Sequence, residues 1–201
     1  MSKRAHRHLL DASRPLRRLH DAIDARGAIR LTRPLRDAPF ELVLCRAVAG
    51  QQLSVHAART IWGRVLERVG EDDLVDYLGG RCTASLRACG LSGAKTKAMR
   101  AIAEAARAGE LDADALAKIP HDERSEQLTA IWGVGPWTAD MMGIFYFGDR
   151  DVWPDGDVTA RKTLQRLTSA RRKTLRTAAL FAPYRSYLAL HMWRHADAAP
   201  A

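Results

Sequence analysis

Apolar positions along this chain recur with the spacing of helices. Between Ser54 and Val69 they return every three or four residues. The positions concerned are Val55, Ala58, Ile61, Trp62, Val65 and Leu66. Ser54 is a favourable N-cap for this helix, and Ser92 is one for a second helix that ends near Ala108, before Gly109. No segment alternates as a half-buried strand does, so the pattern predicts an all-α fold.

Shorter periodic runs predict further helices. They cover 40–49, 73–78, 84–88, 113–118, 124–131, 137–147, 159–167, 171–180 and 183–195, with Pro183 in the first turn of the last one. The Arg-rich residues 1–37 are less periodic, and we expect one or two helices there that pack on the rest of the chain. No low-complexity linker or internal repeat divides the chain.

The charge of the chain is strongly positive and unevenly distributed. The formal net charge is +9 over 201 residues. From Val158 to Arg194 no acidic residue separates the basic ones, which are Arg161, Lys162, Arg166, Arg171, Arg172, Lys173, Arg176, Arg185 and Arg194. Such a segment indicates a polyanionic partner. The alternative is a solvated surface that reflects the preference for Arg throughout the chain.

Membrane, secreted and disulfide-stabilised proteins are disfavoured. No apolar run approaches the roughly 18 residues of a membrane helix, and residues 1–8 are not followed by the apolar stretch of a signal peptide. The three cysteines, Cys45, Cys82 and Cys89, lack the spacing of a disulfide framework. We therefore expect a cytoplasmic protein, with Cys45 in the core because it lies in an apolar run.

The segment from Leu128 to Ala139 (LTAIWGVGPWTA) carries the clearest chemical signal. Gly133 and Gly135 let the chain turn tightly and bring backbone N–H groups to a surface. A helix that begins near Trp137 adds its own unbonded N-terminal N–H groups. Together these groups favour an anion, and a DNA phosphate suits the charge of the chain.

Two carboxylates follow the Trp-Pro turn that comes after the hairpin. Asp155 and Asp157 come after a Trp-Pro turn and lead into the basic segment. By residue type alone either could be a catalytic carboxylate. Asp157 could instead do no more than cap the next helix.

Four segments in this order resemble one family of DNA repair enzymes. They are 46–54 (RAVAGQQLS), 89–97 (CGLSGAKTK), the hairpin together with Asp157, and 183–193 (PYRSYLALHMW). The chain resembles the helix-hairpin-helix DNA glycosylase superfamily, and within it the 3-methyladenine DNA glycosylase II family. One departure is Trp132, where the family usually has proline.

The resemblance implies a two-lobed helical fold with the active-site cleft between the lobes. The hairpin would occupy 124–147 of a glycosylase domain at 38–201, without the N-terminal β domain of larger members. The implied enzyme is monofunctional. It flips out alkylated bases such as 3-methyladenine and 7-methylguanine and hydrolyses the N-glycosidic bond in base excision repair. The alternative is a non-catalytic helix-hairpin-helix DNA-binding module.

The resemblance assigns catalysis to Asp157, since a carboxylate beside C1′ stabilises a cation-like sugar and can activate water. Trp137 stands where lyase-active relatives have a nucleophilic lysine, which tryptophan cannot replace. Its ring can stack on a cationic base, and Trp193 would be the second stacking aromatic. Met141 would line the same pocket. Core packing is the alternative for both tryptophans.

Further roles are implied for the DNA contact. Backbone binding is expected from Gly133, Val134, Gly135, Thr138, Arg161 and Lys162. A wedge that fills the gap left by the flipped nucleotide is expected from Gln51, Gln52 and Leu53, for which a polar helix–helix turn is the alternative. The partner would be double-stranded DNA containing alkylated bases, bound by a monomer that associates with the nucleoid and not with a membrane.

No organic cofactor is expected. A structural Na⁺ or K⁺ in the hairpin would be held by the main-chain carbonyls of Thr129, Ile131 and Val134. Zinc is not expected, because His191 and His195 lack a third ligand. Three cysteines, none after Asp157, do not supply an iron–sulfur cluster.

Overall fold

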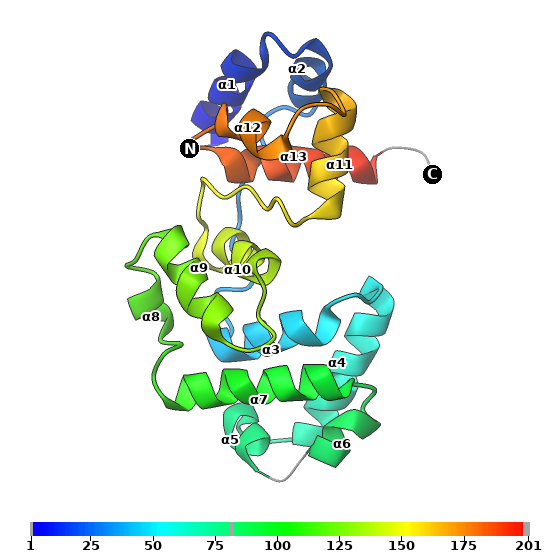
Figure 1. Ribbon diagram of the computed structural model, residues 1–201, viewed down its shortest axis with the longest axis vertical. Coiled ribbons are helices and arrows are strands. Elements are labelled where there is room, and N and C mark those ends of the chain that lie inside the picture. The colour runs from blue at the N-terminus through cyan, green and yellow to red at the C-terminus, as the bar shows by residue number, and fades with distance from the viewer. Residues whose placement is uncertain (1, 81–82, 199–201) are drawn as a thin grey trace. The chain divides into compact units, whose positions relative to one another are not determined.

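Helices account for all the regular structure in the computed structural model, which describes residues 2–80 and 83–198 (Figure 1). Cys82 lies outside the described residues. The predicted all-α fold is confirmed. The chain divides into two packing units. The central unit is Leu35–Met142, and the discontinuous unit combines the described residues of Met1–Pro34 and Gly143–Ala201.

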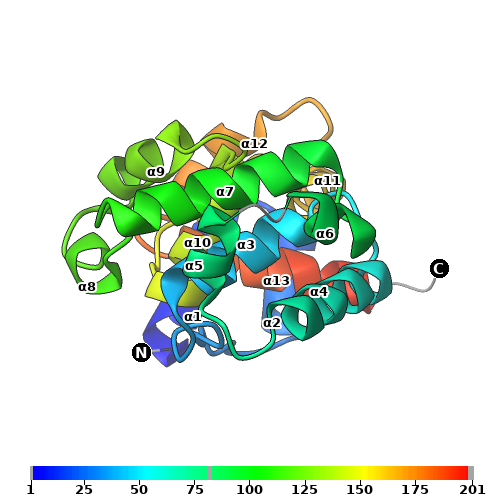
Figure 2. The same ribbon diagram turned by 90° about the horizontal axis from the view of Figure 1, so that it is seen from below.

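The central unit is organised around the long helix α7 (Gly93–Arg107). Helices α3 (Phe40–Gly50), α5 (Leu74–Gly79) and α6 (Thr83–Ala88) pack against α7, and α4 (Val55–Val69) packs on α3 and α6 (Figures 1 and 2). The largest fully buried side chains of these helices are Phe40, Leu44, Leu78, Leu86, Met99 and Ile102. Burial of this apolar surface is the main force that holds the unit together.

The predicted caps and core cysteine are confirmed in this unit. The Ser54 hydroxyl accepts a hydrogen bond from the N–H of Ala57, and that of Ser92 accepts one from the N–H of Lys95, both at 3.2 Å. Cys45 is buried, and burial raises the pKa of its thiol. Leu66 differs from the expected apolar face of α4, because its side chain is 44% exposed.

The hairpin belongs to the central unit. The short helix α8 (Ala113–Leu116) precedes α9 (His121–Ala130), and α10 (Pro136–Met142) packs on α9 and α3. Arg124 of α9 is buried and donates to the carbonyls of Leu116 and Ile119 at 2.8 and 3.3 Å. These charge-assisted bonds fix the start of the hairpin to the segment before it.

The discontinuous unit is arranged around α13 (Arg185–Asp197), which packs against four helices. They are α1 (Ser2–Ser13), α2 (Arg17–Asp24), α11 (Val158–Leu167) and α12 (Thr174–Ala179). Their shared core includes Leu9, Leu19, Ile23, Leu164, Phe181, Leu188 and Met192. The Arg-rich N-terminal segment therefore contributes two helices to the core of the C-terminal ones.

Several helix bounds differ from the sequence-based expectation; α9 begins at His121 and not at 124, and α8 ends at Leu116 and not at 118. Pro183 is not in the first turn of α13, which begins at Arg185 because Tyr184 is not helical (φ −129°). The helix expected over 171–180 spans only Thr174–Ala179, since Ser169 holds Arg171 and Arg172 in a preceding turn. The α-helix expected to reach Phe147 ends at Met142 and continues as a π-helical turn, Gly143–Phe147.

None of the helices in the described ranges has the length and apolarity that crossing a bilayer requires.

Candidate functional site

The turn of the hairpin, residues 131–135, contains two glycines. Its structure requires glycine at position 133, whereas position 135 has room for a side chain. Gly133 has φ +88°, and a Cβ there would lie 2.3 Å from Cβ of Ala98 on α7. A side chain at 133 would therefore be strained and would collide with α7. A Cβ on Gly135 would meet no atom within 4 Å. Packing does not demand glycine at 135, which is consistent with a backbone kept bare for a ligand.

The two arms of the hairpin are joined by polar contacts. The N–H of Val134 donates to the carbonyl of Ile131 at 3.0 Å and closes the turn. The Nε2 atom of His121 lies 3.0 Å from Oδ1 of Asp140 on the other arm. Thr138 is buried, and its hydroxyl oxygen accepts a hydrogen bond from the Gln51 side-chain amide, so the hydroxyl is not exposed to a ligand.

The loop 51–53 is bound directly to the hairpin. The Gln51 side-chain amide donates to the Gly133 carbonyl at 3.3 Å and to Oγ1 of Thr138 at 3.2 Å. Lys95 donates from Nζ to the carbonyls of Ala49 and Gln51, each at 2.8 Å. Desolvation of this ammonium lowers the pKa of Lys95. The structure thus brings the predicted wedge loop and the predicted phosphate site into one hydrogen-bonded assembly.

The end of this loop projects from the protein. Gln52 has φ +57°, and it is the one non-glycine residue with positive φ in the described part of the chain. Leu53 is 37% exposed. A residue held in a sparsely populated backbone region beside an exposed apolar side chain is a frequent feature of functional loops. Lys95, which anchors this loop, lies in segment 89–97, but nothing in the sequence pattern predicts its contacts.

Trp137 and Met141 lie one turn apart on α10. Trp137 is 38% exposed, so it is not a core residue, whereas Met141 is buried. Part of the Trp137 side chain is therefore available for contact with a ligand.

Asp157 accepts two hydrogen bonds on one carboxylate oxygen. It is the N-cap of α11, and its Oδ1 accepts from the N–H of Ala160 at 2.8 Å. The same oxygen accepts from Nε1 of Trp193 at 2.9 Å. The ring of Phe145 lies 5.6 Å from that of Trp193. Asp157 therefore does cap α11, and Trp193 additionally fixes the orientation of the carboxylate.

Asp155 has a different environment. Its Oδ1 accepts from Nε1 of Trp153 at 3.1 Å and from Oγ1 of Thr174 at 2.6 Å. These bonds tie the turn before Asp157 to the start of α12. Asp155 therefore organises the turn, which leaves Asp157 as the better candidate for chemistry.

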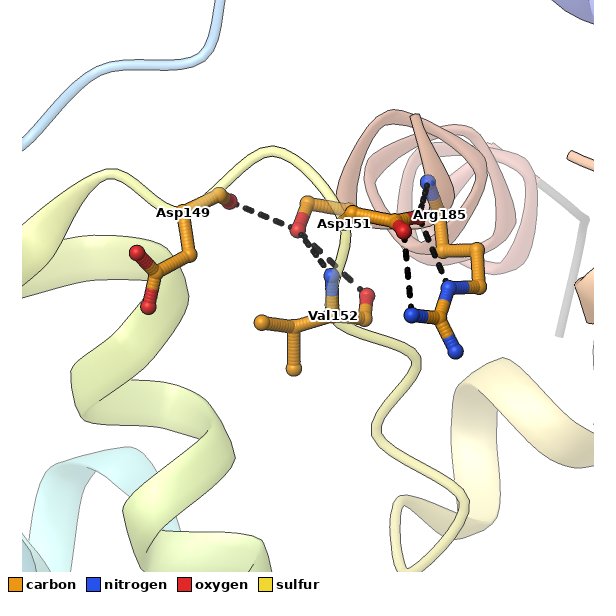
Figure 3. Close-up of polar contacts among 5 residues, drawn as sticks. Asp149, Asp151, Val152 and Arg185 are labelled. Atoms are coloured by element: carbon orange, nitrogen blue, oxygen red, sulfur yellow. Dashed lines mark hydrogen bonds and ion pairs between the residues drawn. The ribbon is translucent and has the colours of Figure 1, made fainter. Parts of the chain in front are cut away.

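The segment that leads to Asp157 is fixed to the N-terminus of α13 (Figure 3). The guanidinium of Arg185 binds both carboxylate oxygens of Asp151, from Nε at 2.7 Å and from Nη2 at 3.0 Å. The Ser186 hydroxyl donates to the Asp149 carbonyl at 2.7 Å and accepts from the N–H of Val152 at 2.9 Å. Together with the Trp193 bond, α13 holds this segment at two points. Segment 183–193 contained these residues, but the sequence did not reveal their partners.

Basic residues follow Asp157 on α11. Arg161 is half-buried and Lys162 is exposed. Arg166, Arg171, Arg172, Lys173 and Arg176 are also exposed. Arg185 differs from them, because its charge is used in the pair with Asp151. Most of the basic segment is therefore a positively charged surface, and Arg185 does not contribute to it because its charge is paired.

The described residues contain no cluster of three or more His, Cys, Asp or Glu side chains that could hold a metal ion. His191 is buried in the discontinuous unit, stacked on His6 with ring centroids 6.0 Å apart. Desolvation, aided by His6, Arg194 and Arg26, lowers the pKa of His191 to about 3. His191 is thus a neutral core residue.

A family model described as HhH-GPD superfamily base excision DNA repair protein matches residues 45–182. The chain belongs to this HhH-GPD superfamily. The hairpin, loop 51–53 and Asp157 all fall within the matched region, and Trp193 lies beyond it.

Individual HhH-GPD relatives give a consistent picture. The chain is 33% identical over 164 residues to DNA-3-methyladenine glycosylase 1 of Schizosaccharomyces pombe, covering 78% of this chain and 72% of the relative. It is 29% identical over 196 residues to DNA-3-methyladenine glycosylase 2 of Escherichia coli, covering 92% of this chain and 62% of the relative.

Two solved HhH-GPD structures resemble the whole chain. The S. pombe 3-methyladenine DNA glycosylase Mag1 in complex with abasic DNA has a TM-score of 0.82 and 29% identity, with 98% of each chain covered. A DNA-3-methyladenine glycosidase from Bacillus halodurans has a TM-score of 0.80 and 29% identity, with 96% and 89% covered. The helix-hairpin-helix glycosylase fold expected from the sequence is confirmed.

Proposed function

We propose that this chain is a monofunctional DNA glycosylase that removes alkylated bases of the 3-methyladenine and 7-methylguanine type from double-stranded DNA in base excision repair. The observation that carries this proposal is the Asp157 carboxylate, fixed by the α11 cap and by Trp193 just before a basic helix. A module that only binds DNA would need the hairpin but would not need a carboxylate oriented by an indole. The relatives named as 3-methyladenine glycosylases support the substrate class.

Binding begins at the hairpin. The bare backbone at Gly135 and the first N–H groups of α10 receive a phosphate of the DNA, and Arg161 and Lys162 of α11 neutralise others. Loop 51–53 enters the stack when the damaged nucleotide leaves it, with Leu53 as the apolar part of the wedge. The Lys95 and Gln51 hydrogen bonds keep that loop in place while the stack pushes against it.

The extruded base is held by aromatic surfaces. Trp137 stacks on it, Met141 supplies an apolar wall, and Trp193 contributes a second aromatic face while it orients Asp157. An alkylated purine carries positive charge, so the indole of Trp137 attracts it more strongly than a neutral base.

Hydrolysis then breaks the bond between C1′ and the base nitrogen. As the electron pair leaves with the base, positive charge develops on the sugar, and the Asp157 carboxylate stabilises it. A water molecule forms the new bond to C1′ and gives its proton to Asp157. A cationic base departs neutral, and the products are the free base and an intact abasic site. The enzyme acts as a monomer at the nucleoid in this proposal.

The hairpin would also hold a structural Na⁺ or K⁺. The hydroxyl of Thr129 donates to the Ser125 carbonyl at 2.8 Å, so Thr129 would contribute its main-chain carbonyl, together with those of Ile131 and Val134. Such an ion offsets part of the phosphate charge when bound.

The test is base release from duplexes that each carry one lesion: 3-methyladenine, 7-methylguanine, 1-methyladenine, ethenoadenine or hypoxanthine. We expect release of at least one of the cationic bases, strand breakage only after alkali, and no adduct trapped by borohydride. A trapped adduct would show a lyase mechanism. DNA binding without release of any base would support the non-catalytic alternative.

A further inference from the structure

Trp132, at the turn of the hairpin, is used by none of the roles above. Its side chain is 45% exposed, although it directly precedes Gly133. The Nζ atom of Lys97 on α7 lies 4.3 Å from the centre of its ring. Exposed indoles are enriched where a protein meets a partner, because they combine a large apolar surface with a polar N–H. Trp132 is therefore a candidate contact residue next to the predicted phosphate site.

A hollow of about 340 Å³ lies beside this pair. Its lining comes from the hairpin turn and from one face of α7: Gly93, Thr96, Lys97, Arg100, Ala101, Glu104 and Trp132. Lys97 and Arg100 are three residues apart and so lie on the same side of the helix. An aromatic wall and two cations thus share one concave surface.

We propose that Trp132, Lys97 and Arg100 form a second DNA contact, which binds a sugar–phosphate unit of the strand next to the phosphate held by the hairpin. This inference rests on the proposed function, because it requires DNA at the hairpin. Charge complementarity supports a phosphate as the occupant, and the adjacency of Trp132 to Gly133 makes the contact continuous with the hairpin. The Lys97 ammonium is already held over the indole, so less side-chain freedom is lost on binding.

The position of Glu104 indicates where in the hollow the phosphate binds. Its carboxylate lines the same hollow and repels an anion. The phosphate therefore lies toward Lys97 and Arg100, and the indole of Trp132 packs against the sugar or the edge of its base. Glu104→Gln removes a negative charge beside the proposed phosphate and should therefore strengthen DNA binding. Lys97→Gln removes a positive charge at the same place and should weaken it.

A direct test observes the indole itself. The full chain is labelled with 5-fluorotryptophan, and the ¹⁹F resonance of Trp132 is identified by its absence in Trp132→Phe. Titration with a duplex that contains an abasic-site analogue should shift this resonance. If the Trp137 resonance moves and that of Trp132 does not, the second contact is disproved while the proposed function stands. If the protein binds no DNA at all, the proposed function itself fails.

Affinity measurements at several salt concentrations test whether the charge of Lys97 contributes to DNA binding. Lys97→Gln should reduce the magnitude of the log–log salt slope of DNA binding by about 0.9, the value for one phosphate contact on duplex DNA. Arg68→Gln, an exposed cation on α4 of the same unit, is the matched control and should leave the slope unchanged. Trp132→Ala should weaken binding at least about fivefold, the lower end for loss of an aromatic contact with a nucleotide. Equal slopes for Lys97→Gln, Arg68→Gln and wild type would overturn the inference.

Phosphate neutralisation locates the contact on the DNA. Each phosphate around the lesion is replaced in turn by a methylphosphonate. We expect one position whose neutralisation weakens wild type but has no effect on Lys97→Gln. If both proteins respond identically at every position, Lys97 contacts no phosphate, and an interaction with an acidic protein becomes the better explanation of the hollow.

Discussion

The indole N–H of Trp193 donates a 2.9 Å hydrogen bond to Oδ1 of Asp157, which lies 36 residues earlier in the chain. The same oxygen caps α11. A carboxylate bound in this way has a fixed rotamer, and positioning of this kind is a large part of electrostatic catalysis. Trp193 therefore positions Asp157, a role that the resemblance did not imply.

Trp193→Phe tests that relationship. The variant keeps an aromatic ring against Phe145 but loses the N–H donor. We expect the single-turnover rate of base release to fall about tenfold, equivalent to about 1.4 kcal/mol of barrier, with unchanged DNA affinity. A normal rate would mean that the α11 cap alone orients Asp157.

Asp157→Asn should slow base release by roughly 10²- to 10³-fold and leave DNA binding intact or slightly stronger. Removing an anion from a DNA interface does not weaken association, but it withdraws transition-state stabilisation of about 3 kcal/mol. The control is Asp155→Asn, which should instead lower the melting temperature, because it disturbs the bonds to Trp153 and Thr174. The assignment is wrong if Asp155→Asn is inactive at a temperature where it is folded and Asp157→Asn is active.

Gly133→Ala and Gly135→Ala should separate stability from binding. Alanine at 133 would adopt a disfavoured φ, which costs about 1–3 kcal/mol, and would also collide with Ala98. Alanine at 135 meets no protein atom, so the free energy of unfolding should change little while DNA affinity falls. Denaturant unfolding and DNA titration measure the two effects. Unimpaired DNA binding by Gly135→Ala would exclude a close backbone contact there.

Trp137→Leu should slow removal of cationic bases more than removal of a neutral lesion such as hypoxanthine. The cation–π part of the interaction is worth about 0.5–2 kcal/mol, and leucine retains bulk without it. Single-turnover rates with saturating enzyme report this difference. Equal losses for charged and neutral bases would show that Trp137 shapes the pocket without sensing charge.

His191 should make the folded state sensitive to acid. Its pKa in the folded protein is about 3, well below the ordinary value of 6.5, so the unfolded chain binds more protons between these two pH values. Its stabilising contribution is present above about pH 6.5 and is lost as pH falls toward 3. Melting curves between pH 7 and 4 should show a weaker pH dependence for His191→Gln than for wild type. His56→Gln, an exposed histidine, is the control and should behave as wild type.

The sequence by itself determined the fold class and singled out the candidate chemical centre. Three features could be predicted because they involve residues close together in the chain: the helical periodicity, the Gly-Val-Gly turn, and the caps at Ser54 and Ser92. The local backbone conformation fixes the distances between such residues. Asp157 could be selected because its neighbours match a family pattern, and its cap on α11 is also a local interaction.

Tertiary structure decided which distant residues hold Asp157 and, separately, loop 51–53 in place. The bonds of Trp193 to Asp157, Arg185 to Asp151 and Lys95 to the carbonyl of Gln51 join residues 34 to 44 positions apart. No periodicity or spacing encodes such pairs, because they depend on how packed helices bring side chains together. The same reason explains why the sequence could not predict the ion pair of Arg185 with Asp151. Only the fold brings Lys97 of α7 over the ring of Trp132.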